Sequence, residues 1–386
     1  MHLVRTALNA TEKPPILDFS AFRESDSRAR TELIEAINRA CRDKGFFQLK
    51  NTNVSIELQS KILQASRDFF NLPLEEKMKC DLNSNNYHRG YERLQAQRLE
   101  PGAESDTKEA IYIGEDLPLN HPRVLAGEYN CGPNLYPQAL GKAFQDVCIE
   151  YYYAVRSLAV EVMKVLALGL GLEEDYFDDF SNDRPSSTLR LIHYPPTPKT
   201  SPLVRGVSAH RDFGCVTILL QDEVGGLQVQ DERTGEWIDI EPTSGAFVIN
   251  IGNTMMRWTN HHFTSGIHRV MNFTSKDRYS VPFFFNGNAE KVISVISGCE
   301  ERRDTSDRPF GPPIKESKYK PIKLRDYLKE QFEASYIPAS IEANSAYHGD
   351  SMETLLAMPS SPGINDAEAV ESNEGEAMND IEMDDP

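Results

Sequence analysis

Residues 210–214 read His-Arg-Asp-Phe-Gly and place a histidine and an aspartate two positions apart. The same letters spell two protein-kinase motifs, H-R-D and D-F-G, which here share one aspartate. A kinase uses one aspartate at the attacking hydroxyl and another on magnesium, so a single residue cannot serve both motifs. Thr217 also stands where the kinase loop requires asparagine. Kinase chemistry is therefore excluded.

Metal binding is the second chemistry that this spacing allows. Side chains two apart on a strand point the same way, so His210 and Asp212 can supply two ligands to one divalent ion. A third ligand from another strand would complete the two-histidine, one-carboxylate set that holds non-haem Fe(II). His261 and His262 lie in a polar stretch, whereas His268 opens the strand-like run HRVMNF. We predict His268 as the third ligand.

Arg278 and Ser280 form a second candidate site, ten residues beyond His268. They share one face of the strand-like run RYSVPFFF, together with Phe284. A buried guanidinium and a hydroxyl suit a carboxylate, because the guanidinium fork binds both oxygens and the hydroxyl donates once more. The pattern predicts a carboxylate receptor.

Arg190 and Tyr194 share one face of the run LRLIHY. If Tyr194 points into a barrel, Arg190 does so too and needs an anionic or carbonyl partner. A salt bridge from Arg190 to the N-terminal helices is an equally weighted alternative. Phe213 is either a core residue or a wall of the pocket. We take Arg190, Phe213 and Phe284 as candidate substrate contacts.

The elements that must position these residues follow from the hydrophobic periodicity. Helical spacing of apolar residues predicts helices over 28–44, 55–71, 138–170 and 323–334. Short apolar runs between Gly, Pro and Asp predict strands at 14–20, 45–49, 188–194, 215–221, 226–230, 236–240, 246–251, 268–273 and 278–285. This order predicts an α+β fold in which a jelly-roll barrel is flanked by N-terminal helices, one long backing helix and a C-terminal helix.

Composition limits the class of protein. The 386 residues are 39% apolar, and the six cysteines are scattered without a C-x-x-C pair. We therefore expect a reduced cytoplasmic protein, with no apolar run long enough to span a membrane. The body has no Lys/Arg cluster interleaved with aromatics, so we expect a small-molecule substrate rather than nucleic acid. A monomer is the favoured oligomeric state.

The C-terminal residues 345–386 are predicted to be a disordered acidic tail. From Asp350 onward they hold 11 acidic residues and no lysine or arginine, which is more than half of the net charge of −18. A passive solubilising tail is favoured over one that binds a basic partner. His348 and Asp350 repeat the H-x-D spacing there, but no histidine follows them, so we assign them no role.

Residues 14–335 resemble the isopenicillin-N-synthase-like family of Fe(II)/2-oxoglutarate-dependent dioxygenases. The resemblance rests on PPILDFS, RGYE, AHRDFGCVTILLQDEVGGLQV, SGIHRVMN and RYSVPFFF. It implies a double-stranded β-helix and the cofactors Fe(2+), 2-oxoglutarate and O2, with ascorbate as a reductant. It also implies that iron binds His210, Asp212 and His268, and that 2-oxoglutarate binds Arg278, Ser280 and Tyr194.

The predicted domains follow this resemblance. Residues 1–13 form a flexible N-terminus, 14–137 an N-terminal region of helices and strands, and 138–335 the oxygenase core. The sequence departs from the family at Arg211, where a small residue is usual between the ligands, and at Ile192, Asn51-Thr52-Asn53 and Gly252-Asn253. None of these departures removes a predicted ligand.

The resulting hypothesis is a dioxygenase that hydroxylates, desaturates or cyclises a small organic molecule, in secondary metabolism, with release of succinate and CO2. One alternative is an iron oxidase of the isopenicillin-N-synthase type, which takes all its electrons from the substrate and does not use 2-oxoglutarate. The other is a non-catalytic barrel that binds partners through the acidic tail. An intact ligand set argues against the non-catalytic alternative.

Overall fold

The computed structural model describes residues 13–24, 27–97, 106–196, 206–272, 274–299 and 319–335. The predicted acidic tail, the His348/Asp350 pair and nearly all of the predicted flexible N-terminus lie outside these residues. All of the described residues belong to one compact unit. The finer division at residue 137 stays a prediction.

The N-terminal third alternates short strands with helices. Its strands are β1 (Ile16–Asp18), β2 (Phe46–Lys50), β3 (Gly90–Glu92) and β4 (Glu109–Ile113), and its helices are α1 (Ser27–Asp43), α2 (Ile56–Phe70), α3 (Leu74–Met78) and α4 (Pro122–Leu125). Ser55 caps α2 by accepting from the backbone N–H of Leu58, and Pro73 follows its end. The predicted helices at 28–44 and 55–71 are confirmed within one residue, whereas β3, β4, α3 and α4 were not predicted.

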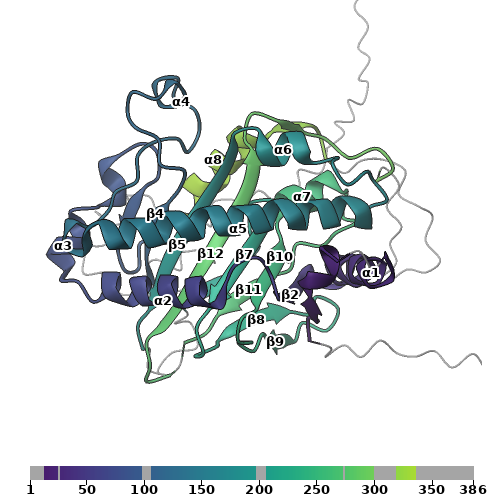
Figure 1. Cartoon of the computed structure of the whole chain (residues 1–386), viewed down its shortest axis with the longest axis horizontal. Coiled ribbons are helices and arrows are strands. Elements are labelled where there is room, and N and C mark those ends of the chain that lie inside the picture. Colours follow the sequence, from purple (N-terminus) through teal and green to yellow (C-terminus); the bar gives the residue numbers. More distant parts are fainter. Residues whose placement is uncertain are drawn as a thin grey trace, which may run out of the picture. The chain divides into compact units, whose positions relative to one another are not determined.

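The long helix α5 (Gly141–Gly169) backs the barrel. The predicted apolar stripe, which includes Phe144, Tyr152, Val155 and Val162, is buried. Figure 1 shows α5 and α2 crossing the same face of the large sheet. Tyr152 packs edge-on against Phe283 of the sheet, with 5.3 Å between the ring centroids. The stripe is therefore core, as the periodicity indicates.

The C-terminal half supplies most of the barrel. Its strands are β5 (Pro185–Tyr194), β6 (Val207–His210), β7 (Val216–Gln221), β8 (Leu227–Gln230), β9 (Trp237–Asp239), β10 (Phe247–Ile251), β11 (His268–Val270), β12 (Arg278–Asn288), β13 (Val292–Ile293) and β14 (Ile322–Lys323). Three helices complete it, namely α6 (Asp178–Asn182), α7 (Asn253–Trp258) and α8 (Leu324–Ala334). Every strand predicted in this half is present.

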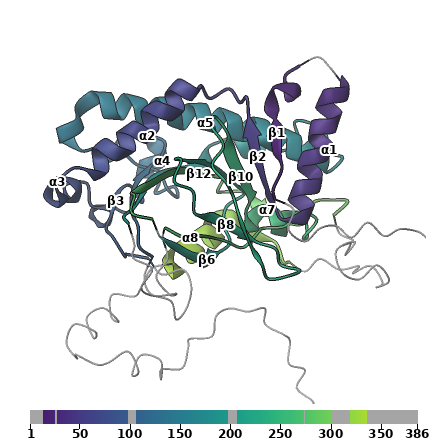
Figure 2. The same cartoon turned by 90° about the horizontal axis from the view of Figure 1, so that it is seen from below.

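Two sheets enclose the interior. The major sheet has the order β1-β2-β10-β7-β12-β5-β4-β3, and the minor sheet has the order β6-β11-β8-β9. All these pairings are antiparallel except β1 with β2. Figure 2 shows α1, α2 and α5 on one side of the major sheet, and β6, β8 and α8 on its other side. This is the predicted double-stranded β-helix, and the N-terminal strands extend its major sheet.

The sheet separates two apolar clusters. The larger one fills the space between the major sheet and the helices, and the smaller one lines the barrel interior with residues such as Phe46, Ile192, Leu227 and Val248. Alternation along each strand produces this division, because successive side chains point to opposite faces. In the part of the chain that the structure describes, no helix is both long and apolar enough to cross a membrane.

Candidate active site

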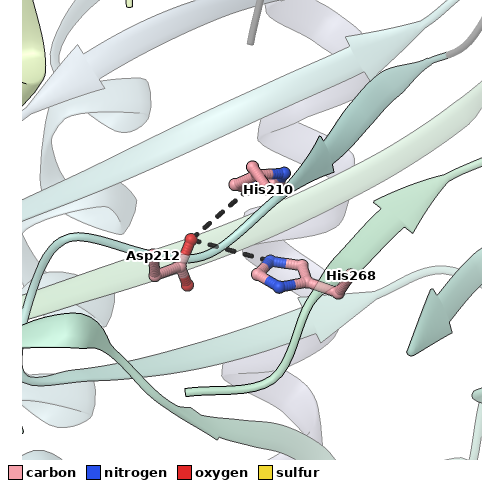
Figure 3. A group of neighbouring side chains, drawn as sticks. All are labelled: His210, Asp212 and His268. Atoms are coloured by element: carbon pink, nitrogen blue, oxygen red, sulfur yellow. Dashed lines mark ion pairs between the residues drawn. The ribbon is translucent and has the colours of Figure 1, made fainter. Parts of the chain in front are cut away.

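His210, Asp212 and His268 meet inside the barrel. Their potential ligand atoms lie within 4.8 Å of one another. His210 at the end of β6 and His268 at the start of β11 are cross-strand partners. Figure 3 shows both imidazoles turned toward the Asp212 carboxylate. Asp212 Oδ1 lies 3.5 Å from His210 Nε2 and 3.6 Å from His268 Nε2.

The Nδ1 atom of each histidine fixes the orientation of its ring. Nδ1 of His210 donates to the Ser208 carbonyl at 2.8 Å, and Nδ1 of His268 donates to the Gly266 carbonyl at 3.1 Å. A proton on Nδ1 leaves the Nε2 lone pair of both rings available to a metal ion. The site thus has the tautomers that a metal needs.

The electrostatics of the three ligands reflect burial and mutual charge. Burial opposes ionisation of Asp212, but His268 and His210 beside it hold the pKa of the carboxyl well below its usual range. Burial also disfavours charge on His210, yet the hydrogen bond and charge of Asp212 raise its pKa. Burial and the neighbouring His210 lower the pKa of His268 to about 4. The site thus holds a carboxylate and a neutral His268 at neutral pH.

Asp212 does not reach the site by strand parity, and this part of our expectation is wrong. Strand β6 ends at His210, so Asp212 lies in the turn that follows. Backbone bonds to α7 fix that turn, since the N–H of Asn253 donates to the Asp212 carbonyl and the N–H of Thr254 to the Phe213 carbonyl. Arg211, between the two predicted ligands, pairs with Glu232 at 2.8 Å.

The competing histidines lie elsewhere. Both follow α7, and His261 Nε2 shares a hydrogen bond with the Tyr319 hydroxyl at 2.5 Å. The His262 ring stands against Phe263, with 5.5 Å between the centroids. Neither belongs to the His210–Asp212–His268 group. The structure therefore favours His268 over both.

Arg278 is a fully buried cation with an unused donor. It has no exposed surface, and it forms no ion pair with any residue that the structure describes. Its Nε donates to the Gly225 carbonyl at 2.5 Å and its Nη2 to Gln221 Oε1 at 3.2 Å, while Nη1 has no partner. A buried guanidinium with an open donor is costly unless an anion completes it. The Arg278 site therefore fits a carboxylate.

Ser280 and Tyr194 stand beside this guanidinium. The Ser280 hydroxyl donates to the Tyr194 hydroxyl at 3.3 Å, and both side chains are buried. Together with Arg278 they line one cavity that also contains the three metal-ligand candidates. A dicarboxylate with a keto-acid end would fit this cavity. Its keto-acid end could chelate a metal at the triad while its other carboxylate contacts Arg278.

A second cavity is lined by two residues of the triad, His210 and Asp212. His210, Asp212, Arg190 and Phe284 line both cavities, whereas Phe213 lines only the second. The guanidinium carbon of Arg190 lies 4.2 Å from the Tyr112 ring centroid and 4.9 Å from that of Phe284. All three predicted substrate contacts therefore lie at this cavity.

The sequence reading missed several residues of these cavities. Gln97 lines both, and it accepts a 2.8 Å bond from the buried ammonium of Lys108. His88 lines the second cavity, where its ring lies 4.4 Å from that of Phe332 on α8. These four residues (Gln97, Lys108, His88 and Phe332) come from segments without a chemical motif. No spacing pattern in the sequence could therefore have predicted them. Among the departures from the family, Ile192 lies in the wall of the Arg278 cavity.

Comparison with known proteins agrees with this geometry. Residues 14–139 match the family described as non-haem dioxygenase in morphine synthesis N-terminal, and residues 185–287 match the 2OG-Fe(II) oxygenase superfamily. The 2-oxoglutarate-Fe(II) type oxidoreductase hxnY of Emericella nidulans is 43% identical over 331 residues, which cover 85% of this chain and 91% of that protein. The 2-oxoglutarate-dependent dioxygenase citB of Monascus ruber is 39% identical, covering 76% and 90%.

Solved structures place the fold in the same group. A full-length Neurospora crassa protein in complex with alpha-KG has a TM-score of 0.71 at 28% identity, covering 85% of this chain and 99% of its own. The same protein has been solved with alpha-KG and thymine.

Fold and site together define a non-haem Fe(II) oxygenase. The chain belongs to the isopenicillin-N-synthase-like family of Fe(II)/2-oxoglutarate-dependent dioxygenases. It is an oxidoreductase that uses Fe(2+), 2-oxoglutarate and O2 on a small organic molecule and releases succinate and CO2. The oxidase alternative is not favoured, because the relatives are named for their use of 2-oxoglutarate.

Proposed function

We propose that His210, Asp212 and His268 hold the Fe(II) ion and that Arg278, Ser280 and Tyr194 hold the far carboxylate of 2-oxoglutarate. The observation that carries this assignment is the unpartnered Nη1 of buried Arg278, in the cavity that the triad shares. Bound iron supplies the oxidising chemistry when it activates O2. The chain supplies three ligands, an anion receptor and an enclosed cavity.

The substrate is proposed to occupy the second cavity. Its wall combines the apolar side chains of Phe213, Phe284 and Phe332 with the cation Arg190, and Asp212 is the only acid among the described residues that line it. A ring-bearing molecule with an anionic or strongly polar group fits this combination, since the guanidinium can bind the group while rings stack on the phenylalanines. We infer a substrate of this class, in secondary metabolism, and ascorbate as the reductant that maintains Fe(II).

Anaerobic titration tests the cosubstrate assignment. Adding Fe(II) and then 2-oxoglutarate to the protein should produce the weak visible charge-transfer band of the chelate. Iron binding without that band would refute the assignment and revive the oxidase alternative. Succinate release by a chain truncated after residue 344 would argue against the partner-binding alternative, because the acidic tail would then be dispensable.

A paired substrate panel tests Arg190. Aromatic carboxylic acids and phenols are compared with their amides and methyl ethers for substrate-stimulated succinate release. The carboxylates and the hydrogen-bonding phenols should be preferred over their amides and methyl ethers, and Arg190→Met should remove the preference while the chelate band persists. Arg269→Met is the matched control, because Arg269 also lies on an aromatic ring, 3.9 Å from the Trp237 centroid, but lines neither cavity. Equal selectivity in both variants would contradict the role of Arg190.

A further inference from the structure

Two neutral side chains hold the oxygen of Asp212 that faces away from the histidines. The Thr217 hydroxyl donates to Asp212 Oδ2 at 2.5 Å, and the Asn250 amide donates to the same oxygen at 2.7 Å. Both residues are buried, with exposed fractions of 4% and 3%. They are cross-strand partners on β7 and β10, so the major sheet sets their separation.

The two oxygens of Asp212 therefore have different surroundings. Oδ1 faces the Nε2 atoms of His210 and His268, whereas Thr217 and Asn250 both donate to Oδ2. A carboxylate that offers both oxygens to a metal occupies two coordination positions, and one that offers a single oxygen occupies one. Two donors on Oδ2 oppose the two-oxygen mode, because binding the metal there would break hydrogen bonds to buried groups.

We propose that Thr217 and Asn250 are positioning residues that restrict Asp212 to metal binding through Oδ1. This restriction keeps a coordination position open for the chelating end of 2-oxoglutarate. The proposal rests on the assignment of the metal ligands above. It adds that the position is kept open by the major sheet, through two residues that are not metal ligands themselves and that line the cavity proposed for 2-oxoglutarate.

Removing each donor separately tests the proposal. Thr217→Val and Asn250→Leu are close in shape to the residues that they replace, and Thr217→Ser retains the hydroxyl. Binding of Co(II) alone is titrated first, followed by anaerobic titration of the Fe(II)-loaded protein with 2-oxoglutarate at the charge-transfer band. Thr217→Val and Asn250→Leu should each weaken metal or cosubstrate binding by about 10- to 100-fold. Thr217→Ser should bind both like the wild type.

A matched control separates positioning from packing. Thr259 is another buried threonine with a bonded hydroxyl, which donates to the Met255 carbonyl at 2.9 Å in α7. Thr259→Val should leave both titrations unchanged. Circular dichroism of the metal-free variants checks folding, and Asn250→Ser replaces Asn250→Leu if the latter does not fold.

The outcomes distinguish this proposal from the proposed function. Without a charge-transfer band in the wild type, the cosubstrate assignment fails and the positioning role fails with it. If the wild type shows the band and the folded Thr217 and Asn250 variants match it in both affinities, the positioning role alone is overturned. The same loss in Thr217→Ser as in Thr217→Val would also overturn it, since the hydroxyl would then not be the cause.

Discussion

Arg278 and Tyr194 are cross-strand partners on β12 and β5, and the guanidinium carbon of Arg278 lies 4.7 Å from the centre of the Tyr194 ring. The ring covers one face of the cation, while backbone and amide oxygens occupy two of its nitrogens. One nitrogen remains for an external anion. In the proposed site, this pair would connect the register of the major sheet to recognition of the cosubstrate.

Arg278→Met should raise the KM for 2-oxoglutarate by at least about 100-fold, because a charge-assisted hydrogen bond and the opposite charge beside a buried carboxylate are together worth about 3 kcal/mol or more. Binding of Co(II) should be unaffected, since Arg278 is not a metal ligand. Tyr194→Phe, which removes one hydroxyl, should change KM by less than about tenfold. Steady-state succinate formation measures both, and an unchanged KM in Arg278→Met would show that the cosubstrate binds elsewhere.

His268→Ala should abolish iron binding and turnover, because it removes one of three ligands. His262→Ala is the matched control, since His262 lies outside the triad. Isothermal titration with Co(II) and single-turnover succinate release measure the two effects. The reverse pattern, with loss in His262→Ala and retention in His268→Ala, would show the third ligand to be misassigned.

Metal affinity should fall as the pH falls through the raised pKa of His210. Burial opposes protonation of that ring, but the Asp212 carboxylate lifts its pKa above 6.5, so His210 takes up a proton that a metal must displace. His268 contributes little above pH 5, because its pKa is lowered to about 4. Co(II) affinity should drop about tenfold per pH unit below the raised value. Constant affinity from pH 8 to 5.5 would contradict a protonated His210.

We expect a buried ion pair on the outer face of the major sheet to contribute to the free energy of unfolding but not to cosubstrate binding. Lys77 Nζ lies 2.8 Å from Glu109 Oε2, and both side chains are about 10% exposed or less. Lys77→Met should lower the free energy of unfolding by roughly 3 kcal/mol, since it leaves the carboxylate without its cation. Urea denaturation measures the loss. Lys142→Met, from an exposed pair with Asp146, should change stability by less than about 0.5 kcal/mol.

The chelate band of Lys77→Met should remain that of the wild type, because Glu109 and Lys77 line neither cavity. If a folded Lys77→Met protein lost the chelate band, the ion pair on the outer face would be shown to affect binding at the candidate active site. Stability unchanged by the substitution would mean that the Tyr91 hydroxyl and His193, which also bond Glu109, are sufficient to stabilise its charge.

Much of the architecture could be predicted because periodicity is a local property. The stripe of α5 and the strand runs β5, β7, β10 and β12 each carry their pattern within a few residues, and all were placed correctly. Strands β3 and β4 were missed, since EAIYI and GYE are short and buried throughout, without alternation. Helix α7 was missed for a similar reason, because six residues carry little helical period.

The sequence by itself determined which residue types could form the site. His210, Asp212 and His268, followed by Arg278 and Ser280, indicate an iron and a carboxylate site by their chemistry and order. Only the tertiary structure decided how Asp212 reaches the histidines. Hydrogen bonds from α7 hold its turn, and donors from β7 and β10 hold its outer oxygen. These contacts join residues up to 41 positions apart, and no local pattern records them, because their partners are chosen by the pairing of strands across the whole sheet.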